Sequence, residues 1–161
     1  MIRFALVIII SVQTLSACSN TKMSHEKNQN SKVISNSQNV SDSCTRCDIL
    51  TVKNTESHIN ELKYTNLHRF LYTFSKDCSK NIEYSEYSNE MLFKVFEKYP
   101  EQLINCMSKE KDLDIDYILL ELSTPLLDIN GKVIYEKVQN ASGDKLIKEK
   151  ILEALKKAID Y

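Results

Sequence analysis

Apolar residues recur at the spacing of an α-helix through most of the chain after about residue 55. A recurrence every 3.6 residues places the apolar side chains of a segment on one face of a helix. The 161 residues include only two glycines and two prolines, and strand-rich folds depend on these residue types for their turns. Both features favour a fold built from helices.

The periodicity predicts five or six amphipathic helices joined by short loops. Pro100 stands where proline is tolerated, at the first turn of a helix, and Pro125 ends a helix because the residue before proline avoids the helical conformation. Segment 132–139 begins either a short helix or a strand. We therefore expect an all-α fold, either a small antiparallel helical bundle or a stack of helical hairpins. The expected helices cover residues 55–77, 85–99, 100–108, about 112–122 and 144–159.

The first 17 residues have the pattern of a secretory signal. Arg3 supplies the positive charge, an apolar run begins at Phe4, and small residues stand at Ser16 and Ala17. The apolar run is too short to cross a bilayer as a helix, which needs about 20 residues. It also has no polar face, so a core helix of a folded domain is disfavoured.

The sequence Leu15-Ser16-Ala17-Cys18 resembles the lipobox of bacterial lipoprotein precursors, and all four positions match. The resemblance covers about the first 18 residues. It implies that Cys18 is lipidated with diacylglycerol and an N-linked acyl chain such as palmitate and becomes the mature N-terminus. Ser19 then follows where an Asp would retain the protein at the inner membrane, which implies a cell-envelope protein at the outer membrane, facing the periplasm. Several acyl chains, at about 0.8 kcal/mol per buried methylene, make a durable anchor. The alternative is ordinary cleavage and release.

Residues 18–43 are rich in Ser, Asn, Lys and Gln and contain no aromatic residue. Such a segment cannot bury enough apolar area to offset its ordering entropy, so we expect a flexible tether that spans roughly 25–30 Å. The predicted organisation is a signal peptide over 1–17, a tether over 18–43 and a helical domain over 44–161.

The formal net charge is -1, and it becomes -2 without the signal segment, whose only charge is Arg3. Nucleic-acid binding needs a basic patch and a high isoelectric point. We therefore expect no nucleic-acid partner.

With Cys18 assigned to lipid, four cysteines remain, an even number that predicts two disulfides in an exported domain. Pairing Cys78 with Cys106 would join neighbouring helices and leave Cys44 to pair with Cys47. Crosswise pairing, which ties residues 44–47 to the bundle, is nearly as well supported. A redox pair at Cys44 and Cys47, or a four-cysteine zinc site, is disfavoured because neither a βαβ pattern nor a second close pair is present.

Other metal-binding patterns are weak. His58 and Glu61 are three residues apart on one expected helix, and His68 lies further along, so an exposed polar face is the simpler interpretation. The run from Asp112 to Asp116 lacks the glycine and the final glutamate of a calcium loop and is expected to cap a helix. The sequence therefore predicts no metal and no cofactor beyond the lipid on Cys18.

No catalytic motif is present, so we do not expect an enzyme; a site around His58, Glu61 and His68 would be the alternative. Tyr84, Tyr87 and Tyr99 belong to an aromatic cluster that is mostly core, but their hydroxyl groups are candidates for an exposed interface. The predicted function is binding of another protein, as an envelope assembly partner or an immunity-type inhibitor. Carriage or sensing of a small apolar ligand is the alternative, and it requires a cavity of about 300 Å³ or more.

Overall fold

The computed structural model describes residues 45–160, within the second of two units into which the chain divides, Cys44–Tyr161. This range contains seven α-helices, one 3₁₀-helix and no strand. The all-α prediction is confirmed. The predicted signal peptide, lipidation site and tether lie outside the described residues. Between residues 45 and 160, no helix combines the length and apolar character needed to cross a bilayer.

The helices follow one another with short connections. Their bounds are α1 Ile49–Ser57, α2 Tyr64–Tyr72, the 3₁₀-helix η1 Lys76–Lys80, α3 Ile82–Lys98, α4 Pro100–Lys109, α5 Ile115–Ser123, α6 Gly131–Asn140 and α7 Lys145–Ile159.

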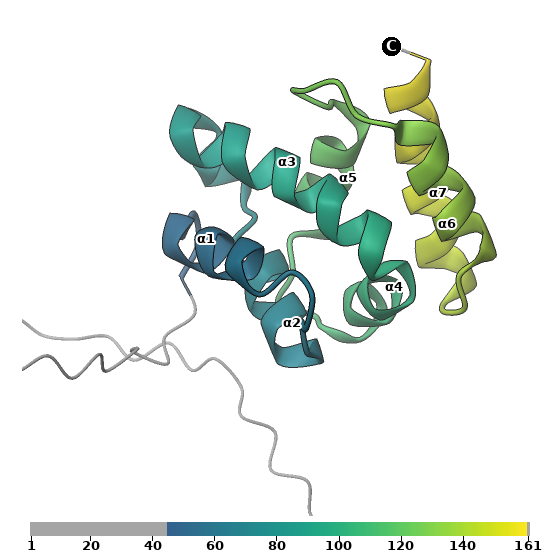
Figure 1. Ribbon diagram of the computed structural model, residues 1–161, viewed down its shortest axis with the longest axis horizontal. Helices are drawn as coiled ribbons and strands as arrows, with labels where there is room; N and C mark the ends of the chain where they lie inside the picture. Colours follow the sequence, from purple (N-terminus) through teal and green to yellow (C-terminus); the bar gives the residue numbers. More distant parts are fainter. Residues whose placement is uncertain (1–44, 161) are drawn as a thin grey trace, which may run out of the picture. The chain divides into compact units, whose positions relative to one another are not determined.

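Helix α3 is the longest and the most central. It contacts α1, η1, α4, α5 and α6, whereas α7 packs on α4, α5 and α6. Figure 1 shows α1 and α2 on one side of α3 and the α6–α7 hairpin on the other. Helices α1 and α6 therefore both pack on α3, while α2 and α7 both contact α4.

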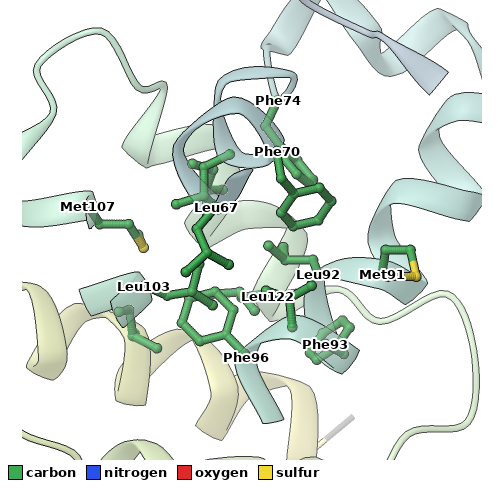
Figure 2. Close-up of a cluster of buried hydrophobic side chains, with 14 of the residues drawn as sticks. Leu67, Phe70, Phe74, Met91, Leu92, Phe93, Phe96, Leu103, Met107 and Leu122 are labelled. Atoms are coloured by element: carbon green, nitrogen blue, oxygen red, sulfur yellow. The ribbon is translucent and has the colours of Figure 1, made fainter. Parts of the chain in front are cut away.

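The core is aliphatic and aromatic. Figure 2 shows side chains of α2, α3, α4 and α5 meeting in one interior, with Leu67, Phe96 and Leu103 among them; all three are fully buried. The rings of Phe70 and Phe74 meet edge to face with centroids 5.2 Å apart. Burial of each such side chain contributes about 1.5–3 kcal/mol, so this interior holds the four helices together.

The single helix predicted over residues 55–77 is wrong. The chain forms α1 and α2 with a connector between them, and then η1. The hydroxyl group of Tyr99 donates a hydrogen bond to the carbonyl oxygen of Ile59 (2.9 Å) and accepts one from the amide of Leu62 (3.3 Å). A side chain 37 and 40 residues away thus satisfies backbone groups that a helix would otherwise pair. The apolar periodicity of residues 55–77 could not predict this contact with a distant residue.

The other predicted helices are present with small shifts. Helix α3 begins after Asn81, whose side chain caps it, rather than after Ser85. Pro100 opens α4, and Asp114 and Asp144 cap α5 and α7. The open choice for 132–139 resolves as helix α6.

Gly143 allows the α6–α7 turn to approach α4 closely. Its φ is +142°, and a Cβ built there would lie 2.5 Å from Cγ2 of Ile104. Any other residue would therefore strain the backbone and collide with the core.

Candidate functional site

One disulfide joins the start of the described segment to η1. It links Cys47 and Cys78, so the pairing of Cys78 with Cys106 is wrong, and one of the crosswise bonds is present. Cys106 is a free, buried thiol. Its partner in the crosswise scheme, Cys44, lies outside the described residues. The position of Cys78 and Cys106 on neighbouring expected helices favoured their pairing. That argument did not consider that the chain before α1 folds back onto the domain and brings Cys47 to Cys78.

Arg46 attaches the same segment to two other parts of the domain. Its Nη1 atom donates to the carbonyl oxygens of Tyr72 (2.8 Å) and Phe74 (2.7 Å), and Nη2 donates to the carbonyl oxygen of Asp112 (2.5 Å). The guanidinium also lies 4.0 Å from the centroid of the Tyr72 ring. The sequence offered no sign of this role beyond the position of Arg46 between two cysteines.

Directly beside this attachment, a histidine and two carboxylates converge. His68 Nε2 lies 3.1 and 3.2 Å from the two carboxylate oxygens of Asp112 and 4.0 Å from Oε2 of Glu110. His68 comes from α2, Glu110 is the C-cap of α4, and Asp112 lies in the α4–α5 connection. We call this group the His68 cluster. Its three ligand-type atoms lie within 4.8 Å of one another.

Two titratable side chains, Tyr64 and Cys106, interact with Glu110 of the His68 cluster. The hydroxyl group of Tyr64 donates to Oε1 of Glu110 at 2.7 Å, and burial together with this bond raises the pKa of Tyr64 well above its usual value. Cys106 lies one helical turn before Glu110. Burial, with the Glu110 carboxylate as a smaller cause, raises the pKa of the Cys106 thiol to about 12, so the thiol stays protonated at neutral pH.

The structure does not bring together the polar residues that the sequence grouped. His58 ends α1, where its Nδ1 lies 2.9 Å from the carbonyl oxygen of Asn54, and Glu61 is exposed in the α1–α2 connector. His68 instead faces residues more than 40 positions later in the chain. Sequence reasoning missed the His68 cluster because it searched along one helix, and the partners come from another.

The three candidate interface tyrosines face mainly inward or toward neighbouring helices. Tyr84 is 1% exposed and donates to Oγ1 of Thr73 at 2.7 Å, so it cannot belong to an exposed surface. Tyr99 binds the α1–α2 connector. Tyr87 is partly buried and hydrogen-bonds Glu56 of α1. These hydroxyl groups are engaged in holding the fold, and they do not form an exposed patch.

Three exposed leucines instead lie close together in the sequence, on α5 and in the α5–α6 connector. Leu120, Leu126 and Leu127 are each more than half exposed; we call them the leucine surface. Helical spacing places Leu120 on the face of α5 opposite the buried Ile118 and Leu122, whereas no sequence signal marked Leu126 and Leu127 as exposed.

A buried asparagine on α3 fixes this connector. Asn89 is 1% exposed. Its Nδ2 donates to the carboxylate (2.7 Å) and the carbonyl oxygen (3.1 Å) of Glu121, and its Oδ1 accepts from the amide of Leu126 (3.1 Å). A buried amide with its donors and acceptor used in this way holds a loop in one conformation. The backbone at Leu126 is therefore held in place while its side chain stays exposed to water.

A surface groove between the α3–α4 junction and α6 has a different character. Its lining includes Val133 and Ala141 among its apolar members and five charged side chains, Glu97, Lys98, Glu101, Glu136 and Lys137. Glu97 and Lys137 pair across it at 3.0 Å. Sites for apolar ligands are lined mainly by hydrophobic and aromatic side chains, so this groove does not favour carriage of such a ligand.

Comparison of the chain with protein-family models, with curated proteins and with solved structures gives no match. Function has to be inferred from the residues of the chain itself.

Proposed function

We propose that the chain is a lipid-anchored bacterial envelope protein whose helical domain binds another protein through the leucine surface. The observation on which this proposal depends most is the exposure of Leu120, Leu126 and Leu127, with Asn89 holding the backbone at Leu126. Full burial of an exposed leucine contributes about 1.5–3 kcal/mol, and because each of these leucines is already about half buried, covering the rest contributes roughly 1 kcal/mol for each of them. A partner protein that covers this surface recovers that free energy, and a rigid connector loses little entropy in the process.

The anchoring half of the proposal rests on the lipobox resemblance at Leu15 to Cys18. A lipid on Cys18 would confine the domain to a membrane surface and concentrate it near membrane-bound partners. We further propose the outer membrane, on its periplasmic side, because Ser19 rather than Asp follows the lipidated residue. The choice between an assembly partner and an immunity-type inhibitor depends on the identity of the bound protein.

Fractionation of cells tests the anchor. Wild-type protein is expected in the membrane fraction as a processed, lipidated chain, and Cys18→Ser is expected to remain unprocessed at that position. Processed Cys18→Ser that still sediments with membranes would contradict lipid anchoring.

Site-specific photo-crosslinking in the native cell tests the interface. A photoreactive residue placed at Leu126 or Leu127 is expected to give one discrete adduct. The matched control is the same residue at Leu50 of α1, which is also exposed (72%) but lies outside the leucine surface. Adducts of equal yield from both places would indicate nonspecific contact and contradict the proposal, as would no adduct at Leu126 and Leu127.

A further inference from the structure

We propose that His68, Glu110 and Asp112 form a binding site for a divalent transition-metal ion of the zinc type. An imidazole nitrogen and two carboxylates are ligands that such ions accept, and the imidazole favours them over Mg²⁺ and Ca²⁺. This inference concerns a surface other than the leucine surface and does not depend on the proposed function.

The spacing of the ligand atoms fits one ion. Bonds of about 2.0–2.1 Å in a tetrahedral site place neighbouring ligand atoms about 3.3 Å apart. The measured separations from His68 Nε2 are 3.1 and 3.2 Å to Asp112 and 4.0 Å to Glu110. All three ligand atoms lie within 4.8 Å of one another, so Glu110, a side chain at a helix end, has to move closer to complete the site.

The exposure of the three side chains leaves room for the remaining ligand. Their exposed fractions rise from 18% for His68 through 32% for Glu110 to 41% for Asp112. The histidine is therefore held in place by packing while the outer side is open to water. A water molecule can complete the coordination, as it does in zinc sites with three protein ligands.

The surroundings orient two of the three ligands. Tyr64 donates to the second oxygen of Glu110, Oε1, which leaves Oε2 directed at His68. Arg46 fixes the backbone of Asp112 through its carbonyl oxygen. Such outer contacts are typical of metal sites, where they set the direction of the ligating atoms.

Charge also permits a cation here. Two carboxylates outweigh the guanidinium of Arg46, and Arg46 contacts the carbonyl oxygen of Asp112 rather than its carboxylate. A bound dication would hold α2 to the α4–α5 connection, two parts that the disulfide does not join.

Calorimetric titration of the full chain in detergent with Zn²⁺, with the disulfide intact, tests the site. We expect one saturable site in the wild type. His68→Gln and Asp112→Asn are each expected to weaken binding by more than about a hundredfold, because each removes a direct ligand. Tyr64→Phe removes only an outer hydrogen bond and is expected to cost about tenfold.

The matched control is His58→Gln, since His58 is an exposed histidine on α1, away from the His68 cluster. It should bind Zn²⁺ as the wild type does. The proposal is overturned if no saturable binding occurs, if His68→Gln binds like the wild type, or if His58→Gln loses binding to the same extent. Circular dichroism of each variant without metal establishes folding. If either ligand variant fails to fold, Tyr64→Phe still tests the site, because it keeps all three ligands and changes only the outer hydrogen bond to Glu110.

Co²⁺ in place of Zn²⁺ identifies the ligand set. A site of imidazole and carboxylate gives weak visible bands only. A strong thiolate charge-transfer band would assign the metal to a cysteine and contradict the site as proposed.

Discussion

The buried thiol of Cys106 illustrates how a single residue couples the fold to pH. Burial raises its pKa from 9.0 to about 12. Below pH 9 the thiol is protonated in both the folded and the unfolded chain, so its contribution to stability does not change. Between the two pKa values the unfolded chain releases this proton and the folded chain keeps it, so the free energy of unfolding falls as pH rises.

Cys106→Ala should reduce this alkaline loss of stability. Denaturant unfolding at neutral pH and at a pH between 9.0 and about 12 measures the change for the wild type and the variant. Tyr84, whose pKa burial raises to about 12, titrates in both and leaves a common background. The variant starts less stable, by about 1 kcal/mol or more from the lost packing, but should lose less on going to alkaline pH. Parallel losses would show that the Cys106 thiol is not protected.

Asn89 is the second residue whose environment leads to a prediction. Asn89→Ala removes the partner of the Leu126 amide and of the two Glu121 oxygens. Leaving buried groups unpaired costs about 1–3 kcal/mol, and we expect that decrease in the free energy of unfolding. Hydrogen exchange should also accelerate at residue 126. Gln102→Ala, at an exposed position of α4, is the control, and an equal effect there would contradict a specific role for Asn89.

At the scale of elements, the α1–α2 connector depends on α3. Tyr99, the C-cap of α3, accepts from the Leu62 amide and donates to the Ile59 carbonyl oxygen. Tyr99→Phe keeps the ring and removes both bonds, so we expect a loss of about 1–3 kcal/mol. Exchange at the Leu62 amide should accelerate, whereas the α6–α7 hairpin should be unaffected. Uniform acceleration over the whole domain would instead indicate that the connector and the core open together.

The elements themselves were largely predictable from sequence. Helices α3, α4, α5 and α7 follow from periodicity together with local caps, such as Asp144 before α7 and Pro100 at the start of α4. These signals act within one turn of the helix they control. The break after α1 was not predictable, because Tyr99 stabilises it from a distant part of the chain.

The sequence also did not predict the His68 cluster, because its members come from distant parts of the chain. Its members come from α2 and from the segment after α4, and their approach is decided by the packing of α2 on α4. In the leucine surface, helical spacing already separates Leu120 from the buried Ile118, but the exposure of Leu126 depends on a connector that Asn89 of α3 holds in place. Local sequence therefore specifies helices here, whereas contacts between helices determine both candidate sites.

Over the whole domain, the disulfide and the hydrogen bonds of Arg46 stabilise one end and not the other. The disulfide and Arg46 both secure the segment before α1, and α1 itself packs on α2 and α3. The α6–α7 hairpin has neither attachment and depends on apolar packing, with Ile151 and Leu155 fully buried. The two ends of the domain should therefore respond differently to a reductant.

Reducing the disulfide should destabilise the domain by about 3–4 kcal/mol, the loop-closure value for its sequence separation of 31. Denaturant unfolding with and without reductant measures the change, and hydrogen exchange should show α1 and η1 opening before α7. The double variant Cys47→Ala, Cys78→Ala should match the reduced wild type and respond no further to reductant. Cys106→Ala keeps the bond between Cys47 and Cys78 and should lose as much stability in reductant as the wild type does.

If reductant destabilises the double variant as much as the wild type, its effect does not arise from the bond between Cys47 and Cys78. If α7 opens first, the packing of the hairpin rather than the disulfide limits the stability of the fold.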